Sequence, residues 1–216
     1  PASKLHIIPN SVDPERFANV TPADLSAYGI APDRKVIVFV GRLDHQKGVD
    51  VLLNAVAEVI SQRPDTTLLI VGEGRERSNL QQQVENLKLK ENVVCLPWQE
   101  NPLPIIAAAD LVAIPSRWEG MPNVLLEAIA LERPFVVTDV EGVREVLGNI
   151  DDRQLPLPGD APALADALCS AIGPSSTSHE QALALRQRLF AEFSGESMVE
   201  KYEELYRGLL TQWEKR

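Results

Sequence analysis

Two glutamates separated by seven residues, Glu119 and Glu127, flank a turn that leads into a predicted helix over residues 124–131. Pro122 suits the start of that helix, because the missing N–H of proline would be unpaired in the first turn anyway. Gly120 allows a ligand to approach the backbone closely. The free N–H groups of such a helix start bind phosphate. A phosphate site between two carboxylates suits a ligand with a central diphosphate and hydroxyl-rich groups at both ends, such as a nucleotide sugar.

A second group of charged and flexible residues follows the apolar run 36–40. That run ends in Gly41 and Arg42, and the loop closes with Lys47 and Gly48. The glycines permit a tight turn, and two cations in one loop of an acidic protein suggest a clamp for a diphosphate. Taken alone, the same charges fit an ordinary solvated surface loop equally well.

Composition limits the classes of function. The chain has 216 residues, of which 44% are hydrophobic and 24% are charged, and its net charge is −10. These values are ordinary for one large or two small globular domains. The acidic balance argues against nucleic acid as a partner.

Nothing in the sequence indicates a metal, a disulfide or a membrane span. Cys95 and Cys169 stand alone in apolar segments, which predicts buried thiols, and the three histidines lack ligand spacing. No apolar run approaches the roughly 20 residues that cross a bilayer. We expect a cytoplasmic protein without a cofactor. Because the chain starts almost directly on a strand candidate with no initiating Met, we also expect it to be a fragment of something longer.

Apolar runs alternate with stretches of helical spacing. Strands are expected at residues 36–40, 68–71, 93–96, 111–114 and 134–138, with a sixth suggested at 154–157 and an N-terminal strand at 5–8 joining the sheet. Helices are expected at residues 49–60, 78–89, 104–109, 124–131, 143–147 and 162–172. The alternation predicts an α/β fold with a doubly wound, Rossmann-like parallel sheet over residues 1–172. Residues 173–216 are expected to add a linker and two helices, at 179–193 and 197–213.

In such a sheet ligands bind beyond the carboxyl ends of the strands. The loops at 41–48 and 115–122 both lie there, together with the Gly72-Glu73-Gly74 turn and the end of the strand at 93–96. Trp98 follows that last strand, and we interpret it as a partly buried packing residue. The convergence of these loops at one sheet edge is a stronger signal than any single motif.

These motifs resemble glycosyltransferase family 4, a family of retaining enzymes with the GT-B fold. Glu119 and Glu127 match its Glu-(seven residues)-Glu motif. Other similar stretches are Gly41-Arg42-Leu43…Lys47-Gly48, Ile8-Pro9-Asn10…Val12-Asp13, Val71-Gly72-Glu73-Gly74 and Tyr202…Leu205-Tyr206. The similarity covers most of the chain, is weakest over residues 148–195, and does not specify the sugar.

The resemblance implies the C-terminal, donor-binding half of a GT-B enzyme, with the acceptor site in a preceding domain. Arg42 and Lys47 would neutralise the leaving diphosphate, Glu119 would hold the donor sugar, and Glu127 would bind the ribose. These three, Glu119, Arg42 and Lys47, are the implied catalytic residues. Further donor contacts are implied for Gly41, Gly120, Met121, Asn123 and Val124, and for the segment Val94 to Leu96 facing the base.

The resemblance also implies a UDP- or GDP-linked donor, a glycan or lipid-linked acceptor, and no divalent metal, because the helix dipole and the cations serve instead. The full-length protein would be cytoplasmic or peripheral at the inner face of a membrane. Two positions depart from the family pattern, since Glu132 and Pro97 stand where glycine is common. These departures are expected to affect a helix end and the base pocket.

Three alternatives remain open from the sequence. The chain is an enzyme's donor half that is inactive alone, an isolated nucleotide-sugar-binding module, or part of a GT-B epimerase or phosphorylase. A flavodoxin-like regulator lacks support, because no acidic cluster follows the first strand of the regular pattern. The sequence leaves the oligomeric state open.

Overall fold

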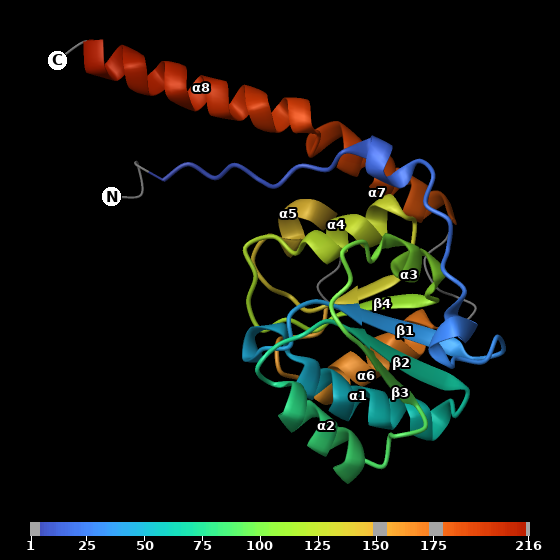
Figure 1. The fold of residues 1–216 in the computed structure, drawn as a ribbon. Helices are drawn as coiled ribbons and strands as arrows, with labels where there is room; N and C mark the ends of the chain where they lie inside the picture. Colours follow the sequence, from blue (N-terminus) through green and yellow to red (C-terminus); the bar gives the residue numbers. More distant parts are fainter. Residues whose placement is uncertain (1–4, 149–154, 173–178, 215–216) are drawn as a thin grey trace.

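The computed structural model describes residues 5–148, 155–172 and 179–214. Its centre is a parallel sheet of five strands in the order β3-β2-β1-β4-β5 (Figure 1). The strands are β1 (Lys35–Val40), β2 (Thr66–Val71), β3 (Val93–Leu96), β4 (Leu111–Ile114) and β5 (Phe135–Val137). This is the strand order of a doubly wound Rossmann-like sheet, which confirms the predicted fold class.

The central strand β1 and its neighbour β2 are largely buried. β1 pairs with β2 along its whole length, from Lys35 opposite Thr66 to Val40 opposite Val71. All six residues of β2 are buried, as are the four middle residues of β1. Because helices cover both faces of a parallel sheet, such strands are apolar on both sides, and β-branched side chains pack well there.

Helices form a layer on each face of the sheet (Figure 1). One layer packs against the core that contains Ile37 and Phe39, and the other against the core that contains Val36 and Val38. The first layer consists of α1 (Val49–Gln62), α2 (Arg77–Asn86) and α6 (Ala161–Ala171), and the second of α3 (Leu103–Ala108), α4 (Asn123–Ala130) and α5 (Val143–Leu147). An outer helix, α7 (His179–Glu192), packs on α4.

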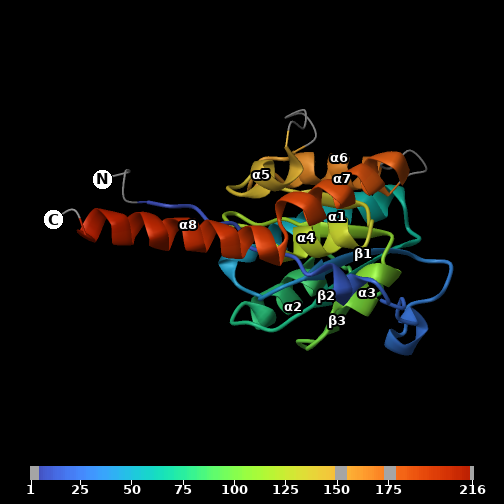
Figure 2. The same ribbon diagram turned by 90° about the horizontal axis from the view of Figure 1, so that it is seen from above.

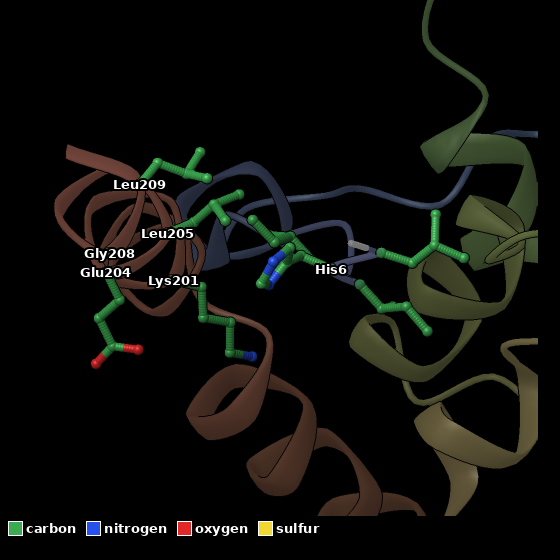
Figure 3. Close-up of a pocket in the computed structure, with 9 residues that line it drawn as sticks. His6, Lys201, Glu204, Leu205, Gly208 and Leu209 are labelled. Atoms are coloured by element: carbon green, nitrogen blue, oxygen red, sulfur yellow. The ribbon is translucent and has the colours of Figure 1, made fainter. Parts of the chain in front are cut away.

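The last helix leaves the body of the protein. α8 (Gly195–Glu214) projects away from the sheet, and residues 5–8 run beside it (Figures 1 and 2). A groove of about 460 Å³ lies between them, and in Figure 3 His6 faces the side of α8 that carries Lys201, Leu205 and Leu209. None of the described helices, α8 included, is both long and apolar enough to cross a membrane.

The prediction that residues 5–8 join the sheet is wrong. Val12 directs the chain elsewhere: its N–H donates to the Phe193 carbonyl at 2.8 Å, and it forms an isolated bridge with Ser194. The N-terminal segment is therefore attached where α7 meets α8. Residues 5–8 form no strand, and their side chains line the groove beside α8 instead.

The suggested sixth strand is also absent from the described residues 155–157, and Gln154 lies outside them. The segment makes one backbone bond to the region after β5, in which Asp139 donates to the Pro156 carbonyl at 2.9 Å. Pro156 and Pro158 have no N–H to donate, so a regular ladder cannot continue here.

Glu132 shows how the chain tolerates a missing glycine at the end of α4. Its φ is +54°, in the left-handed region that normally favours glycine. The next N–H, of Arg133, bonds back to the Ala128 carbonyl at 2.9 Å, so the helix ends as it would with glycine. The Glu132 carboxylate accepts from Arg186 of α7 at 2.8 Å, and this contact offsets part of the strain.

Candidate functional site

The loops after β1 and β4 meet at the switch point of the sheet, where successive crossovers leave in opposite directions. Gln46, in the loop after β1, makes two hydrogen bonds to the loop after β4. Its carbonyl accepts from the Arg117 N–H at 2.7 Å, and its side chain donates to the Trp118 carbonyl at 3.0 Å. The Arg117 guanidinium reaches Asp50 with two bonds of 2.8 and 2.7 Å. Ligands of open α/β sheets bind at this switch point.

Burial raises the pKa of the Asp50 carboxyl, but the hydrogen bonds and charge of Arg117 outweigh burial and hold that pKa below its usual value. The two residues therefore remain an ion pair at neutral pH. A bidentate guanidinium–carboxylate pair has a defined geometry, so it fixes the loop after β4 against the start of α1.

Two glycines allow these backbones to touch. Gly48 has a φ of +65°, and a Cβ placed on it would lie 2.1 Å from the Pro115 carbonyl oxygen. A Cβ on Gly72, at the end of β2, would lie 1.9 Å from the Gly41 carbonyl oxygen. Any side chain at either position would therefore push apart the loops that form the site.

Lys47 and Glu119, which the family resemblance assigned to different parts of a donor, lie in direct contact. Lys47 Nζ donates to Glu119 Oε1 at 2.5 Å, and Ser116 Oγ donates to the same oxygen at 2.7 Å. The Glu119 side chain is only 8% exposed. Among the described residues nothing donates to Oε2, which leaves that oxygen available to a ligand hydroxyl.

Arg42 differs from Lys47 in its surroundings. Its side chain is 72% exposed and is restrained by Gln46, to which it donates at 3.3 Å, and by Asp44 at 3.5 Å. Both are long contacts at the surface, so the guanidinium can turn toward an incoming anion at little energetic cost.

The start of α4 is open. Pro122 is the N-cap and supplies no side-chain hydrogen bond. The N–H groups of Asn123 and Val124 have no partner in the described structure, whereas the Leu125 N–H bonds to the Pro122 carbonyl at 3.0 Å. A Cβ on Gly120 would meet nothing within 4 Å. Met121 packs half-buried against the core, so its side chain does not cover the start of the helix.

Glu127 lies one turn into α4 and is half-buried. Its carboxylate has no hydrogen-bond partner among the described residues. Desolvation by burial raises the pKa of Glu127, and the charge of Arg16 partly offsets this effect. A desolvated acceptor with no protein donor is suited to receive ligand hydroxyls.

The predicted base-facing segment lies on the edge strand β3, which pairs only with β2 on one side. The Leu96 carbonyl accepts from the Gly72 N–H at 3.1 Å, so the backbone of Leu96 points into the sheet, as does that of Val94 two residues earlier. By strand alternation the backbone groups of Cys95 point outward, on the side of β3 that has no strand neighbour in the described structure.

Two expectations for this segment are wrong. Cys95 is exposed rather than buried, because β3 has no neighbour on its outer side. Trp98 is 67% exposed rather than packed. Neither feature was visible in the sequence, since an edge strand and an inner strand have the same apolar pattern. Elsewhere, no group of three or more metal-ligating side chains occurs in the described part of the chain.

Sequence reasoning gave no individual role to three residues that shape the site, Ser116, Asp50 and Asn10. Asn10 Nδ2 donates to Asn123 Oδ1 at 2.8 Å, across 113 positions of sequence. The only signal for Asn10 was its place in one of the family-like motifs. The partners of Ser116 and Asp50 depend on how the loops cross, which periodicity does not report.

Together, the strand order and the parallel sheet define a Rossmann-like domain, and its open helix start at the switch point is a feature that binds anions in other proteins. Comparison with known proteins narrows this class. Residues 34–173 match the family model described as glycosyl transferases group 1, and the chain belongs to that family.

Characterised relatives and solved structures agree with the family. The chain is 30% identical over 183 residues to N-acetyl-alpha-D-glucosaminyl L-malate synthase of Bacillus anthracis, covering 85% of this chain and 48% of that protein. It is 29% identical to the Escherichia coli UDP-Gal:alpha-D-GlcNAc-diphosphoundecaprenol alpha-1,3-galactosyltransferase, covering 94% and 54%. Anabaena HepE in complex with UDP and glucose matches with a TM-score of 0.79 and 25% identity, covering 97% and 57%. The fold is thus that of the GT-B glycosyltransferases, and the chain spans about half the length of these proteins.

Proposed function

We propose that this chain is the donor-binding half of a retaining glycosyltransferase of family 4. It would bind a nucleoside diphosphate hexose and present its sugar to an acceptor glycan or lipid-linked glycan. The observation that carries the proposal is the open start of α4, with its free N–H groups, between the Lys47-bound Glu119 and the unpartnered Glu127. This arrangement matches a sugar, a diphosphate and a ribose in that order.

The reaction needs charge stabilisation where the leaving group forms. The bond between the anomeric carbon and the diphosphate oxygen breaks, a bond to the acceptor hydroxyl oxygen forms, and the acceptor proton is released. Negative charge develops on the diphosphate, beside the start of α4 and within reach of the mobile Arg42. Lys47 is already neutralised by Glu119, so Arg42 supplies the less committed positive charge. We propose that these groups replace a divalent metal.

The nucleotide is proposed to be uridine-based. The galactosyltransferase relative carries UDP-Gal in its name, and the HepE structure holds UDP with glucose. In this chain the outward backbone of Cys95 offers one N–H and one carbonyl at the edge of β3. Uracil presents a matching acceptor and donor on one edge, and the exposed Trp98 lies two residues beyond the end of that strand.

We propose that α8 packs on the half of the enzyme that carries the acceptor site. Its exposed face holds Tyr202, Tyr206, Leu209 and Leu210, and Leu5 and Ile7 beside it are exposed as well. An apolar face of this kind on a projecting helix marks an interaction surface. Substituting Leu209 with Glu should leave nucleotide binding by this chain unchanged and abolish complementation by a separately produced acceptor half.

The donor site is tested by titrating the chain with UDP, GDP and ADP, and with UDP-glucose and UDP-galactose, by calorimetry without divalent metal. We expect selective binding of uridine nucleotides. Glu127→Ala should weaken UDP binding by about 1–3 kcal/mol, through lost ribose hydrogen bonds. Glu91→Ala is the matched control. Glu91 is exposed and precedes β3, at the amino ends of the strands and so away from the site, and its substitution should leave UDP affinity unchanged. Equal affinity of the Glu127 variant and the wild type would refute the role of Glu127.

Two other functions remain as outcomes of further measurement. Binding without transfer by the full-length protein would favour a pure binding module. Interconversion or phosphorolysis of a sugar by the full-length protein would favour an epimerase or phosphorylase. The family match and the named transferases among the relatives favour transfer.

A further inference from the structure

Asn10 reaches the open start of α4 from a segment more than a hundred residues away in sequence. Its side-chain amide donates to Asn123 Oδ1 at 2.8 Å, and Asn123 is the first residue of α4. The two side chains are exposed, so the bond contributes little to folding stability. Because the bond lies at the proposed phosphate site, it bears on ligand binding instead.

In this structure the bond occupies the oxygen end of the Asn123 amide. Oδ1 is occupied by Asn10, so the NH₂ group faces away from Asn10, and it has no partner among the described residues. Without this restraint, an asparagine at a helix start competes for nearby backbone N–H groups through its own oxygen. The backbone N–H groups of Asn123 and Val124 also have no partner in the described structure, so they lie beside this NH₂ group at the start of α4.

Asn10 is held on an anchored segment. Two residues later the Val12 N–H bonds to the Phe193 carbonyl at 2.8 Å, and Asp13 caps the short helix Pro14–Phe17, in which Phe17 is buried. That short helix also carries Arg16, whose charge acts on Glu127. One segment thus places one side chain at the start of α4 and a positive charge near its second turn.

We infer that Asn10 is a positioning residue of the donor site: it orients the Asn123 amide so that its N–H donors join the backbone N–H groups of α4 toward a diphosphate. The inference rests on the proposed function. It adds a residue that acts through Asn123, and it gives the contact between this N-terminal segment and α4 a role in ligand binding.

Asn10→Asp tests the orientation directly. Aspartate keeps the shape but can only accept, so Asn123 must turn its NH₂ group toward residue 10 and its oxygen toward the diphosphate. We expect UDP affinity to fall about tenfold or more, since lost donors and a facing acceptor both oppose the anion. Uridine affinity should stay within about twofold, because the nucleoside has no phosphate. Asn19→Asp adds the same charge to an exposed position of the same segment and is the control.

Repeating the substitution in an Asn123→Ala background separates the effect of amide orientation from the effect of the added negative charge. In Asn123→Ala there is no amide to orient, so Asn10→Asp should weaken UDP binding no more than Asn19→Asp does. An undiminished loss in that background would show that the aspartate acts by charge alone and would overturn the inference. Unchanged UDP affinity in Asn10→Asp, with a wild type that binds UDP, would overturn it as well. If the wild type binds neither UDP nor pyrophosphate, the proposed function itself fails and the inference with it.

Discussion

Lys47 and Glu119 form an ion pair at the centre of the candidate site, with Nζ and Oε1 2.5 Å apart. The Glu119 side chain is nearly buried, and the Lys47 side chain is 20% exposed. The pair joins the loop after β1 to the loop after β4, so it holds the site together as well as supplying its charges. A ligand that uses either group must share it with the other.

Removing Lys47 should therefore cost stability. Lys47→Met leaves the Glu119 carboxylate with only the Ser116 hydroxyl, and we expect a loss of about 1–3 kcal/mol in the free energy of unfolding. Arg42→Met should change the free energy of unfolding by less than about 0.5 kcal/mol, because Arg42 is an exposed surface cation. Urea denaturation measures both. Adding Glu119→Gln should recover part of the loss in the Lys47 variant, and purely additive effects would show that the pair is not coupled.

Glu127→Gln should raise stability at neutral pH. Burial raises the pKa of Glu127 in the folded chain above its value in the unfolded chain. The folded state is therefore penalised as pH rises through the range from the ordinary glutamate pKa to the raised one, and the penalty is absent below that range. We expect the variant to gain up to about 1 kcal/mol at pH 7, the usual scale of a single substitution, and nothing at low pH. Thermal unfolding of both proteins across this range checks the sign, and a gain that does not vary with pH would contradict it.

Gly48→Ala should be among the most damaging substitutions in the chain. Alanine there meets both a left-handed φ and the Pro115 carbonyl oxygen. Gly29 has a similar φ of +78° but open space around it, so Gly29→Ala isolates the conformational cost, about 1–2 kcal/mol. We expect Gly48→Ala to lose at least about 2 kcal/mol more than that control in urea denaturation. Equal losses would mean that the loops can separate freely.

Gly120→Ala should leave the free energy of unfolding nearly unchanged and weaken donor binding. Its Cβ meets no atom within 4 Å, and its φ is not left-handed, so unfolding should change by less than about 0.5 kcal/mol. If the donor approaches this backbone, the added methyl group should lower UDP-glucose affinity about tenfold, a loss of about 1.4 kcal/mol. Gly208→Ala on α8, which also has open space, is the control for binding. Retained affinity in the Gly120 variant would place the donor elsewhere.

Much of the fold could be predicted because local patterns determine it. The run Val36 to Val40 is apolar on both faces only if helices cover both sides of its sheet, and the repeated strand–helix alternation leaves few topologies. The carboxyl ends of the strands then follow directly. This is why the loops at 41–48 and 115–122 were expected together, and their hydrogen bonds confirm that they meet.

Other features depended on long-range packing. Residues 5–8 have the pattern of a strand, yet the backbone bond between Val12 and Phe193 sends them along α8 instead. β3 was correctly predicted as a strand, but its place at the edge exposes Cys95. Apolar periodicity reports that a face is buried and does not report which element buries it.

The sequence by itself determined the class of fold, a resemblance to glycosyltransferases and the cluster of loops that forms the candidate site, because these follow from apolar runs, glycine positions and short motifs. Only the tertiary structure decided the partners within that site. Lys47 meets Glu119 across 72 positions, and Asn10 meets Asn123 across 113. Side chains so far apart in sequence are brought together by the crossing of loops and the path of the N-terminal segment, and hydrogen bonds of a few ångströms form only once that path is set.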